Sequence, residues 1–154
     1  MPVCHNPAEL LKAAGCCEAD IVDAALVLFI PWQRTHAEQY QVVSDRIAKA
    51  CMDPTVNTLM YAACLLATVD DTTCDDTTFD CSISDKAADI SDMSGPYLGM
   101  IIAQHLAGTY AYFEYTRYLK HSPGILGKLK NPHITHSIAG LIAGVTSRLY
   151  SEGW

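Results

Sequence analysis

The sequence predicts an all-α fold: five to six helices in one compact domain over residues 1–154, with one long acidic insertion at about 70–94. Three observations support this prediction. An N-cap residue followed by proline, a typical helix start, occurs at Asn6, Asp53 and Asn131. Apolar residues then recur three and four positions apart, as on the buried face of a helix. Half of the residues are hydrophobic and 18% are charged, a globular composition.

Each expected helix has its own start or stop signal. The first ends at Gly15, because glycine readily adopts the left-handed conformation of a helix end. The second meets Pro31, which ends or kinks it. The third is amphipathic, and Ser94 with Pro96 is expected to open the fifth. The helices expected from these signals cover residues 7–14, 18–30, 31–52, 54–69, 97–120 and 133–150.

The segment at 70–92 differs from the rest of the chain in charge. It holds eight acids and one base, Lys86, so it carries −7, which equals the net charge of the whole protein. Its middle alternates, with Phe79, Cys81 and Ile83 on one side and polar residues on the other, which a strand tolerates. We expect a solvated loop or an extended arm at 70–94, with a short hairpin as one form of it. The acids assigned to this arm are Asp70, Asp71, Asp75, Asp76, Asp80 and Asp85.

Paired carboxylates in this arm raise the question of a metal ion. A calcium loop of the EF-hand type needs acids at alternating positions, then glycine, then glutamate. Here the acids are paired, and neither glycine nor glutamate occurs in the arm before Gly95. We therefore expect no metal ligands and no cofactor.

The cysteines raise the question of a redox site. There are seven, an odd number, so at least one is free or joins another chain. Cys74 and Cys81 lie among carboxylates, which makes them poor nucleophiles. We expect them either to form a disulfide that closes a small loop or to crosslink neighbouring subunits.

Charge and motifs argue against several functions. A net charge of −7 and a pI of about 5.1 argue against holding nucleic acid through its phosphates and against polybasic membrane binding. The apolar runs are shorter than the roughly 20 residues of a membrane span, so we interpret the spacing of Gly140 and Gly144 as close packing of soluble helices.

No P-loop, G-x-G-x-x-G or G-x-S-x-G occurs, so we expect no enzyme and no catalytic residue. The first residues lack a secretory signal, and a cytosolic or virion-type product is expected.

Tyrosines are dense in the expected helix at 97–120, where they cover more than one face. Not all of them can point into a single core, and tyrosine suits a protein interface, where one end is buried and the other is wet. The side chains that we assign to a subunit interface are Phe79, Ile83, Tyr110, Tyr112, Tyr115 and Tyr118.

Four histidines keep a ligand site open as an alternative. His133 and His136 lie three residues apart at the start of the last helix, a spacing that can share a metal, whereas His105 and His121 lie elsewhere. Neither H-E-x-x-H nor E-x-x-H occurs, so surface or packing roles are favoured. The alternative is a helical metal- or ligand-binding protein that uses these histidines and the acidic arm.

The layout of residues 8–92 resembles a known family. A short helix "AELLKAAG" is followed by "DIVDAAL", by the Ala- and Leu-rich "YAACLLAT", and by "SISDKAADIS" in the long connection. This layout resembles the small all-helical head–tail connector, or adaptor, proteins of tailed bacteriophages, in which the last of these segments is a long loop or hairpin.

The resemblance implies a non-catalytic virion protein. Identical subunits would form a ring between portal and tail proteins, and DNA would pass through its channel without specific binding. An acidic arm suits that role, since a negative channel repels phosphates. Interchain disulfides at Cys74 and Cys81 could harden the particle outside the reducing cytoplasm. The other class of function that stays open is an accessory subunit of a cellular multiprotein complex.

Overall fold

A computed structural model describes residues 9, 11–12, 15–30, 34–72 and 81–152, and it confirms the all-α fold. Of residues 69–72 and 81–92 it describes only the backbone. Helices and turns make up this described part, which contains no β-strand, and most of the expected first helix lies outside it. The elements in chain order are α2 (Glu18–Leu28), α3 (His36–Cys51), α4 (Pro54–Thr72), α5 (Cys81–Ala107), α6 (Tyr110–His121), the 3₁₀ turn η1 (Gly124–Gly127) and α7 (Pro132–Glu152).

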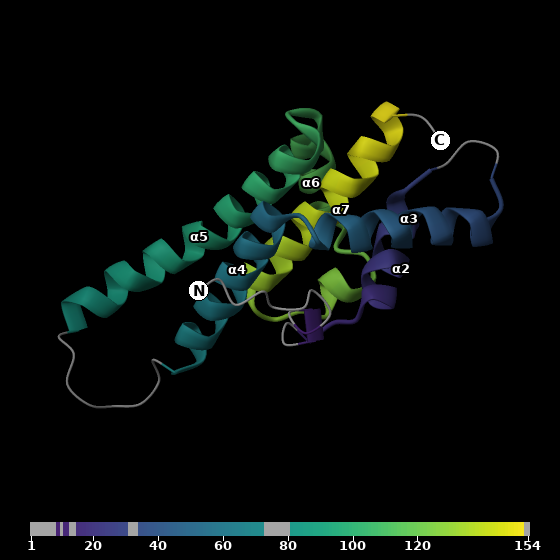
Figure 1. Cartoon of the computed structure of the whole chain (residues 1–154). Coiled ribbons are helices and arrows are strands. Elements are labelled where there is room, and N and C mark those ends of the chain that lie inside the picture. The colour runs from purple at the N-terminus through teal and green to yellow at the C-terminus, as the bar shows by residue number, and fades with distance from the viewer. Residues whose placement is uncertain (1–8, 10, 13–14, 31–33, 73–80, 153–154) are drawn as a thin grey trace.

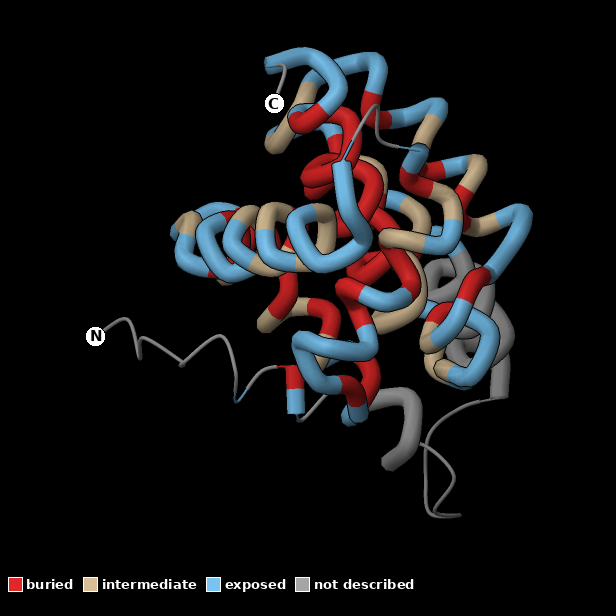
Figure 2. Tube along the Cα trace, turned by 90° about the vertical axis from the view of Figure 1, so that its right-hand side faces the viewer, coloured by how far each residue is buried: buried red, intermediate tan, exposed pale blue. Residues whose placement is uncertain are grey.

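Helix α7 forms the centre of the fold. Every residue from Ser137 to Ser147 is buried, and Figure 2 shows the buried parts of the chain, in red, gathered in the middle of the molecule. Helices α2 to α6 all pack against α7, and α5 does so over the greatest length. A helix that is apolar on all sides is stable only inside a protein, which explains why a stretch without Asp, Glu, Lys or Arg, residues 131–147, became the central element.

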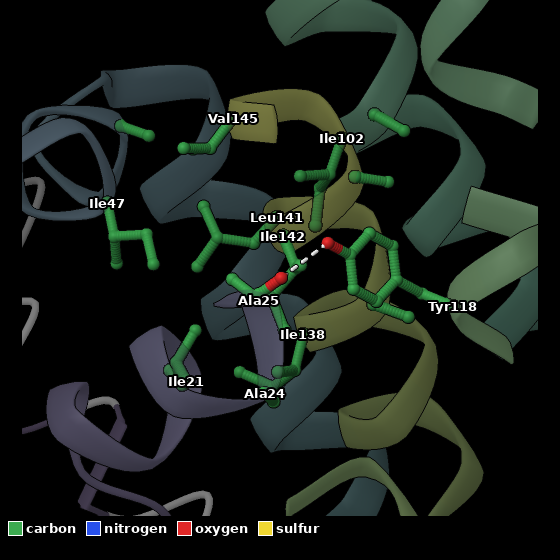
Figure 3. Packing of buried hydrophobic residues seen from close by; sticks show 14 of the residues in the cluster. Ile21, Ala24, Ala25, Ile47, Ile102, Tyr118, Ile138, Leu141, Ile142 and Val145 are labelled. Carbon is green, nitrogen blue, oxygen red and sulfur yellow. Dashed lines mark hydrogen bonds between the residues drawn. The ribbon is translucent and has the colours of Figure 1, made fainter. Parts of the chain in front are cut away.

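The core around α7 is built mainly from aliphatic side chains, with Tyr118 buried among them. Figure 3 shows Ile21 of α2, Ile47 of α3 and Ile102 of α5 gathered around Ile138, Leu141 and Ile142 of α7. The Tyr118 hydroxyl donates a hydrogen bond of 2.7 Å to the Ala25 carbonyl, so α6 and α2 are joined inside this core. Burying each such side chain stabilises the fold by roughly 1.5–3 kcal/mol.

Two helices approach one another closely at paired glycines. A Cβ built on Gly140 of α7 would overlap the backbone of Gly99 in α5, including its carbonyl oxygen. A Cβ on Gly144 would lie 2.6 Å from the Cβ of Leu106. The interpretation of Gly140 and Gly144 as close packing within the domain is therefore confirmed. No helix in the described ranges is long and apolar enough to cross a membrane.

Local capping explains where several helices begin. The Asp53 carboxylate accepts from the backbone N–H groups of Thr55 and Val56 at 2.9 and 3.1 Å, and Asn131 caps α7 in the same way. These two predicted N-caps are confirmed. Helix α3 begins at His36 rather than near residue 31, because Thr35 and Glu38 form a capping box.

The prediction of a loop or extended arm over 70–94 is wrong for most of that segment. Helix α4 continues to Thr72, and helix α5 begins at Cys81. From Cys81 onward the chain is therefore helical where a loop or a short hairpin was expected. Ile83, Ala87 and Ile90 are spaced by four and three residues, which is a helical pattern, and alanine favours helix. The alternation that suggested a strand was too short to decide the structure.

The expected helix at 97–120 is two helices. Helix α5 ends at Ala107, Gly108 has a φ of +70°, and α6 begins at Tyr110. Glycine adopts this conformation without steric cost, so the chain can turn there. Pro96 lies inside α5 and does not open it, which leaves α5 without one backbone hydrogen bond.

Candidate functional site

Four exposed aromatic side chains form the candidate site, which we call the aromatic surface: Tyr110, Tyr112, Phe113 and Tyr150. Tyr110 is 82% exposed and Phe113 is 66% exposed. The rings of Tyr112 and Phe113 lie 6.2 Å apart at an interplanar angle of 70°, an edge-to-face contact. Rings this exposed contribute little to the stability of the single chain.

A shallow hollow of about 340 Å³ lies beside the aromatic surface, and three of the four aromatic residues, all except Tyr112, line it. Tyr110 and Phe113 of α6 line one wall, and Tyr150 of α7 lines the other, with Ala107 at the end of α5. The Tyr150 hydroxyl accepts a hydrogen bond of 2.9 Å from the Ile30 N–H, and its ring packs on Phe29 at 4.9 Å. Tyr150 is thus fixed in place, whereas Tyr110 is free to adapt to a partner.

An ion pair lies at the edge of the hollow. Glu114, which also lines it, accepts a hydrogen bond of 2.8 Å from Arg117. Arg117 donates a second bond of 2.8 Å to the Leu28 carbonyl, so it also ties α6 to the end of α2. Glu114 therefore adds little net charge to the hollow, whose character is aromatic and neutral.

Two of the tyrosines predicted for a subunit interface do not reach the surface. Tyr115 is 3% exposed and Tyr118 is fully buried, and both side chains make their contacts inside the chain. The prediction is wrong for these two residues because the inner face of α6 carries them against α5, α2 and α7. Tyr110 and Tyr112 remain accessible, and their role at an interface stays a prediction.

The remaining predicted site residues fall in or near the segment at 69–92. Phe79, Cys74, Asp75, Asp76 and Asp80 lie outside the described residues, so the proposed disulfide between Cys74 and Cys81 does as well. The others lie on helix backbone, Asp70 and Asp71 near the end of α4, and Cys81, Ile83 and Asp85 in the first two turns of α5.

The histidines are not gathered into one centre. His105 pairs with Asp53 at 3.1 Å, the His133 ring lies 3.1 Å from the Ser94 hydroxyl, and His136 bonds Tyr115. Within the described ranges no three metal-binding side chains of the His, Cys, Asp or Glu type come together. His133 and His136 are brought near each other at the start of α7, but each has its own partner from a neighbouring helix.

The Tyr115–His136 pair is a short internal hydrogen bond. The Tyr115 oxygen lies 2.6 Å from Nδ1 of His136 and 3.3 Å from the Pro96 carbonyl oxygen. Because the hydroxyl has one proton, we assign it to the shorter contact, which places the imidazole proton on Nε2. The desolvation of the ring, together with the neighbouring His133, lowers the pKa of His136 below its ordinary 6.5.

This pKa shift predicts a loss of stability at mildly acidic pH. Below about pH 6.5 the unfolded chain takes up a proton at His136, whereas the folded chain resists protonation there. The free energy of unfolding therefore decreases as the pH is lowered. Urea midpoints at pH 8 and pH 5.5 measure this effect. We expect a smaller fall for His136→Asn, whose Oδ1 can still accept from Tyr115. An equal fall in both proteins would contradict the assignment.

Two of the described cysteines, Cys16 and Cys51, lie in the core with weakly acidic thiols. Cys16 and Cys51 are free and buried, and desolvation raises the pKa of each to about 12. Their thiols are therefore protonated at neutral pH and poor nucleophiles.

Sequence reasoning missed Tyr150 as a member of the aromatic surface. It lies 37 residues beyond Phe113, and no local pattern links the two. Only the packing of α6 against α7 brings them to the same hollow, so no sequence signal could have found the pair.

Comparisons with known proteins give one similar chain. It is the uncharacterized protein MJ1330 of Methanocaldococcus jannaschii, which is 26% identical over 132 residues, covering 84% of this chain and 99% of that protein. The similarity thus concerns nearly the whole helical domain and not a single motif. No protein-family model matches the chain, and no solved structure does.

Proposed function

We propose that this protein is a non-catalytic assembly protein whose copies associate through the aromatic surface. The observation that supports this proposal is the exposure of Tyr110 and Phe113 beside a hollow that a partner's side chain can fill. Exposed aromatic clusters are costly to keep in water and are enriched in the centres of protein interfaces.

The aromatic surface suits a small number of strong contacts. Tyrosine and phenylalanine bury about 150–250 Å² each when they are covered, and a few such residues carry most of the energy of an interface. Tyr150 is already held by Ile30 and Phe29, so its ring loses little entropy when a partner binds. A partner side chain in the hollow would contact the rings of both α6 and α7.

One form of this proposal is the ring-forming head–tail connector of a virion. In that form identical subunits join portal and tail proteins, DNA passes without specific binding, and no membrane is involved. The resemblance of residues 8–92 supports it. The segment "SISDKAADIS" is helical in this structure, whereas that family has a long loop or hairpin there. The chain departs from the family's layout at this segment.

A second candidate is an accessory subunit of a cellular multiprotein complex. The departure just described favours it over the connector, and so does the similar archaeal chain, which matches along almost its full length. This candidate uses the same aromatic surface, but its partners are different proteins. A metal- or ligand-binding role for the histidines is less well supported, because His105, His133 and His136 are already engaged inside the chain.

Light scattering on surface variants tests the proposal. The double variant Tyr110→Ser with Phe113→Ser should elute as a monomer of 16.8 kDa at concentrations where the wild type is larger. Both side chains are exposed, so the variant should keep the unfolding midpoint of the wild type.

Met52→Ser provides the matched control. Met52 is 75% exposed and lies between α3 and α4, outside the aromatic surface. This variant should assemble like the wild type. If the double variant retains the assembled mass of the wild type, the aromatic surface is not the interface.

A further inference from the structure

A second hollow lies between α3, α5 and α7, and three cationic side chains line it. Arg46 and Lys49 come from α3 and Arg148 comes from α7, which together are three of the ten Lys and Arg residues of the chain. The hollow measures about 100 Å³, and Leu106, Gly144 and Val145 are among its apolar lining residues. A basic hollow of this size is unexpected in a protein with a net charge of −7.

Sequence spacing explains how the cations meet. Arg46 and Lys49 are three residues apart, so they lie on the same side of α3. Arg148 is four residues beyond Gly144 and therefore lies one turn further along the same side of α7. Gly144 has no side chain, so the Leu106 side chain of α5 packs directly against α7 beside the hollow.

One carboxylate holds both arginines. Glu152 Oε2 lies 2.9 Å from Nη1 of Arg46, and its Oε1 accepts a hydrogen bond from Nε of Arg148. Each guanidinium uses one of its five N–H donors in this contact. The remaining donors of the two arginines stay available, in a geometry that Glu152 has already fixed.

The charges near the hollow do not cancel. Among the described side chains, three cations stand against two carboxylates, those of Glu152 and Asp53, which leaves one positive charge in excess. Asp53 lines the hollow, but its Oδ1 is occupied by the N–H groups of Thr55 and Val56 and by His105 Nε2. Lys49 has no carboxylate within ion-pair distance in the described part of the chain, so its ammonium is the cation most available to a ligand.

We propose that this hollow binds a phosphate group, either as free phosphate or as the monoester of a small soluble molecule. Guanidinium forks and an ammonium are the groups that recognise phosphate oxygens in proteins. Three cations from two helices reach a tetrahedral anion from different directions. The hollow opens to solvent, so the organic part of a monoester would extend outward. This proposal is independent of the aromatic surface.

Calorimetric titration with inorganic phosphate, and separately with glycerol phosphate, tests the proposal. The ionic strength is held constant with chloride, so that general screening cannot imitate binding. We expect saturable binding at millimolar concentrations with one ligand per chain. Equal affinities would identify a free phosphate site, and tighter binding of glycerol phosphate would identify a monoester site.

Charge-removing variants locate the site. Lys49→Gln and Arg148→Gln should each weaken binding about tenfold or more, as loss of a charge-assisted hydrogen bond does. Arg148→Lys keeps the charge but loses the fork, and it should fall between Arg148→Gln and the wild type. Lys128→Gln changes an exposed lysine outside the hollow and should bind as the wild type does.

Two results would overturn the proposal. One is the absence of saturable binding for both phosphate compounds. The other is an affinity that falls equally in Lys128→Gln and in Lys49→Gln, which would mean that phosphate responds only to net charge. Circular dichroism of each variant shows that the helices are retained, so a loss of binding can be assigned to the hollow.

Discussion

Replacing Gly140 with alanine is expected to destabilise the fold by about 3 kcal/mol, at the upper end of what overpacking costs. The new Cβ would overlap backbone atoms of Gly99. Because the contact is with backbone and not with a flexible side chain, the overlap can be relieved only if a helix shifts. Because α7 packs against α5 along most of its length, separating the two helices would disturb the whole core. Urea unfolding monitored by circular dichroism measures the change.

Ser151→Ala is the control for this glycine variant. It also introduces alanine in α7, but at an exposed position, so its effect should stay within about 0.5 kcal/mol. If Gly140→Ala unfolds at the same urea concentration as Ser151→Ala, the close crossing of α5 and α7 is wrong.

Truncating Tyr118 to alanine is expected to cost about 3–5 kcal/mol, as for other large buried aromatic side chains. Its ring is fully buried among α2, α6 and α7. Tyr118→Phe keeps the ring and removes the hydroxyl that bonds the Ala25 carbonyl, so it should cost only about 1 kcal/mol. The Ala25 carbonyl still accepts from the Phe29 N–H, which limits the loss.

Tyr110→Ala is the matched control, because Tyr110 is the same residue type on the same helix but is 82% exposed. Its effect on unfolding should stay within about 0.5 kcal/mol. Equal destabilisation by Tyr110→Ala and Tyr118→Ala would contradict the inner and outer faces that we assign to α6.

The helix starts that depend on local capping residues are the part of the fold that could be predicted from the sequence. Asp53 and Asn131 cap helices where the N-cap and proline pattern places them. Thr35 with Glu38 is an equally local signal, three residues apart, and would have placed the start of α3 correctly. The small residues of α7 also predict close packing, because only glycine permits backbones to approach so closely.

The errors come from segments without a decisive local pattern. The start of α5 is polar and carries few apolar residues, so composition suggested a loop although alanine and the spacing of Ile83, Ala87 and Ile90 favour helix. Gly108 stands inside an apolar run, where glycine is sometimes tolerated within a helix. In the structure Gly108 instead has a φ of +70°, and the chain turns there.

The candidate site could be predicted only in part. The tyrosine-rich stretch indicated an interface, but the sequence does not separate Tyr110 and Tyr112 from the buried Tyr115 and Tyr118, which differ only in their side of α6. The basic hollow was not predicted, because Arg46 and Arg148 are 102 residues apart and meet only through the packing of α3 on α7.

Native mass spectrometry of the wild type over a range of protein concentrations tests the central claim most directly. Self-association through the aromatic surface predicts species at whole multiples of 16.8 kDa, which grow with concentration. A larger share of these multimers in the absence of reductant would add support for intermolecular disulfides. A wild type that stays monomeric at every concentration, with and without reductant, would contradict the self-association that we propose.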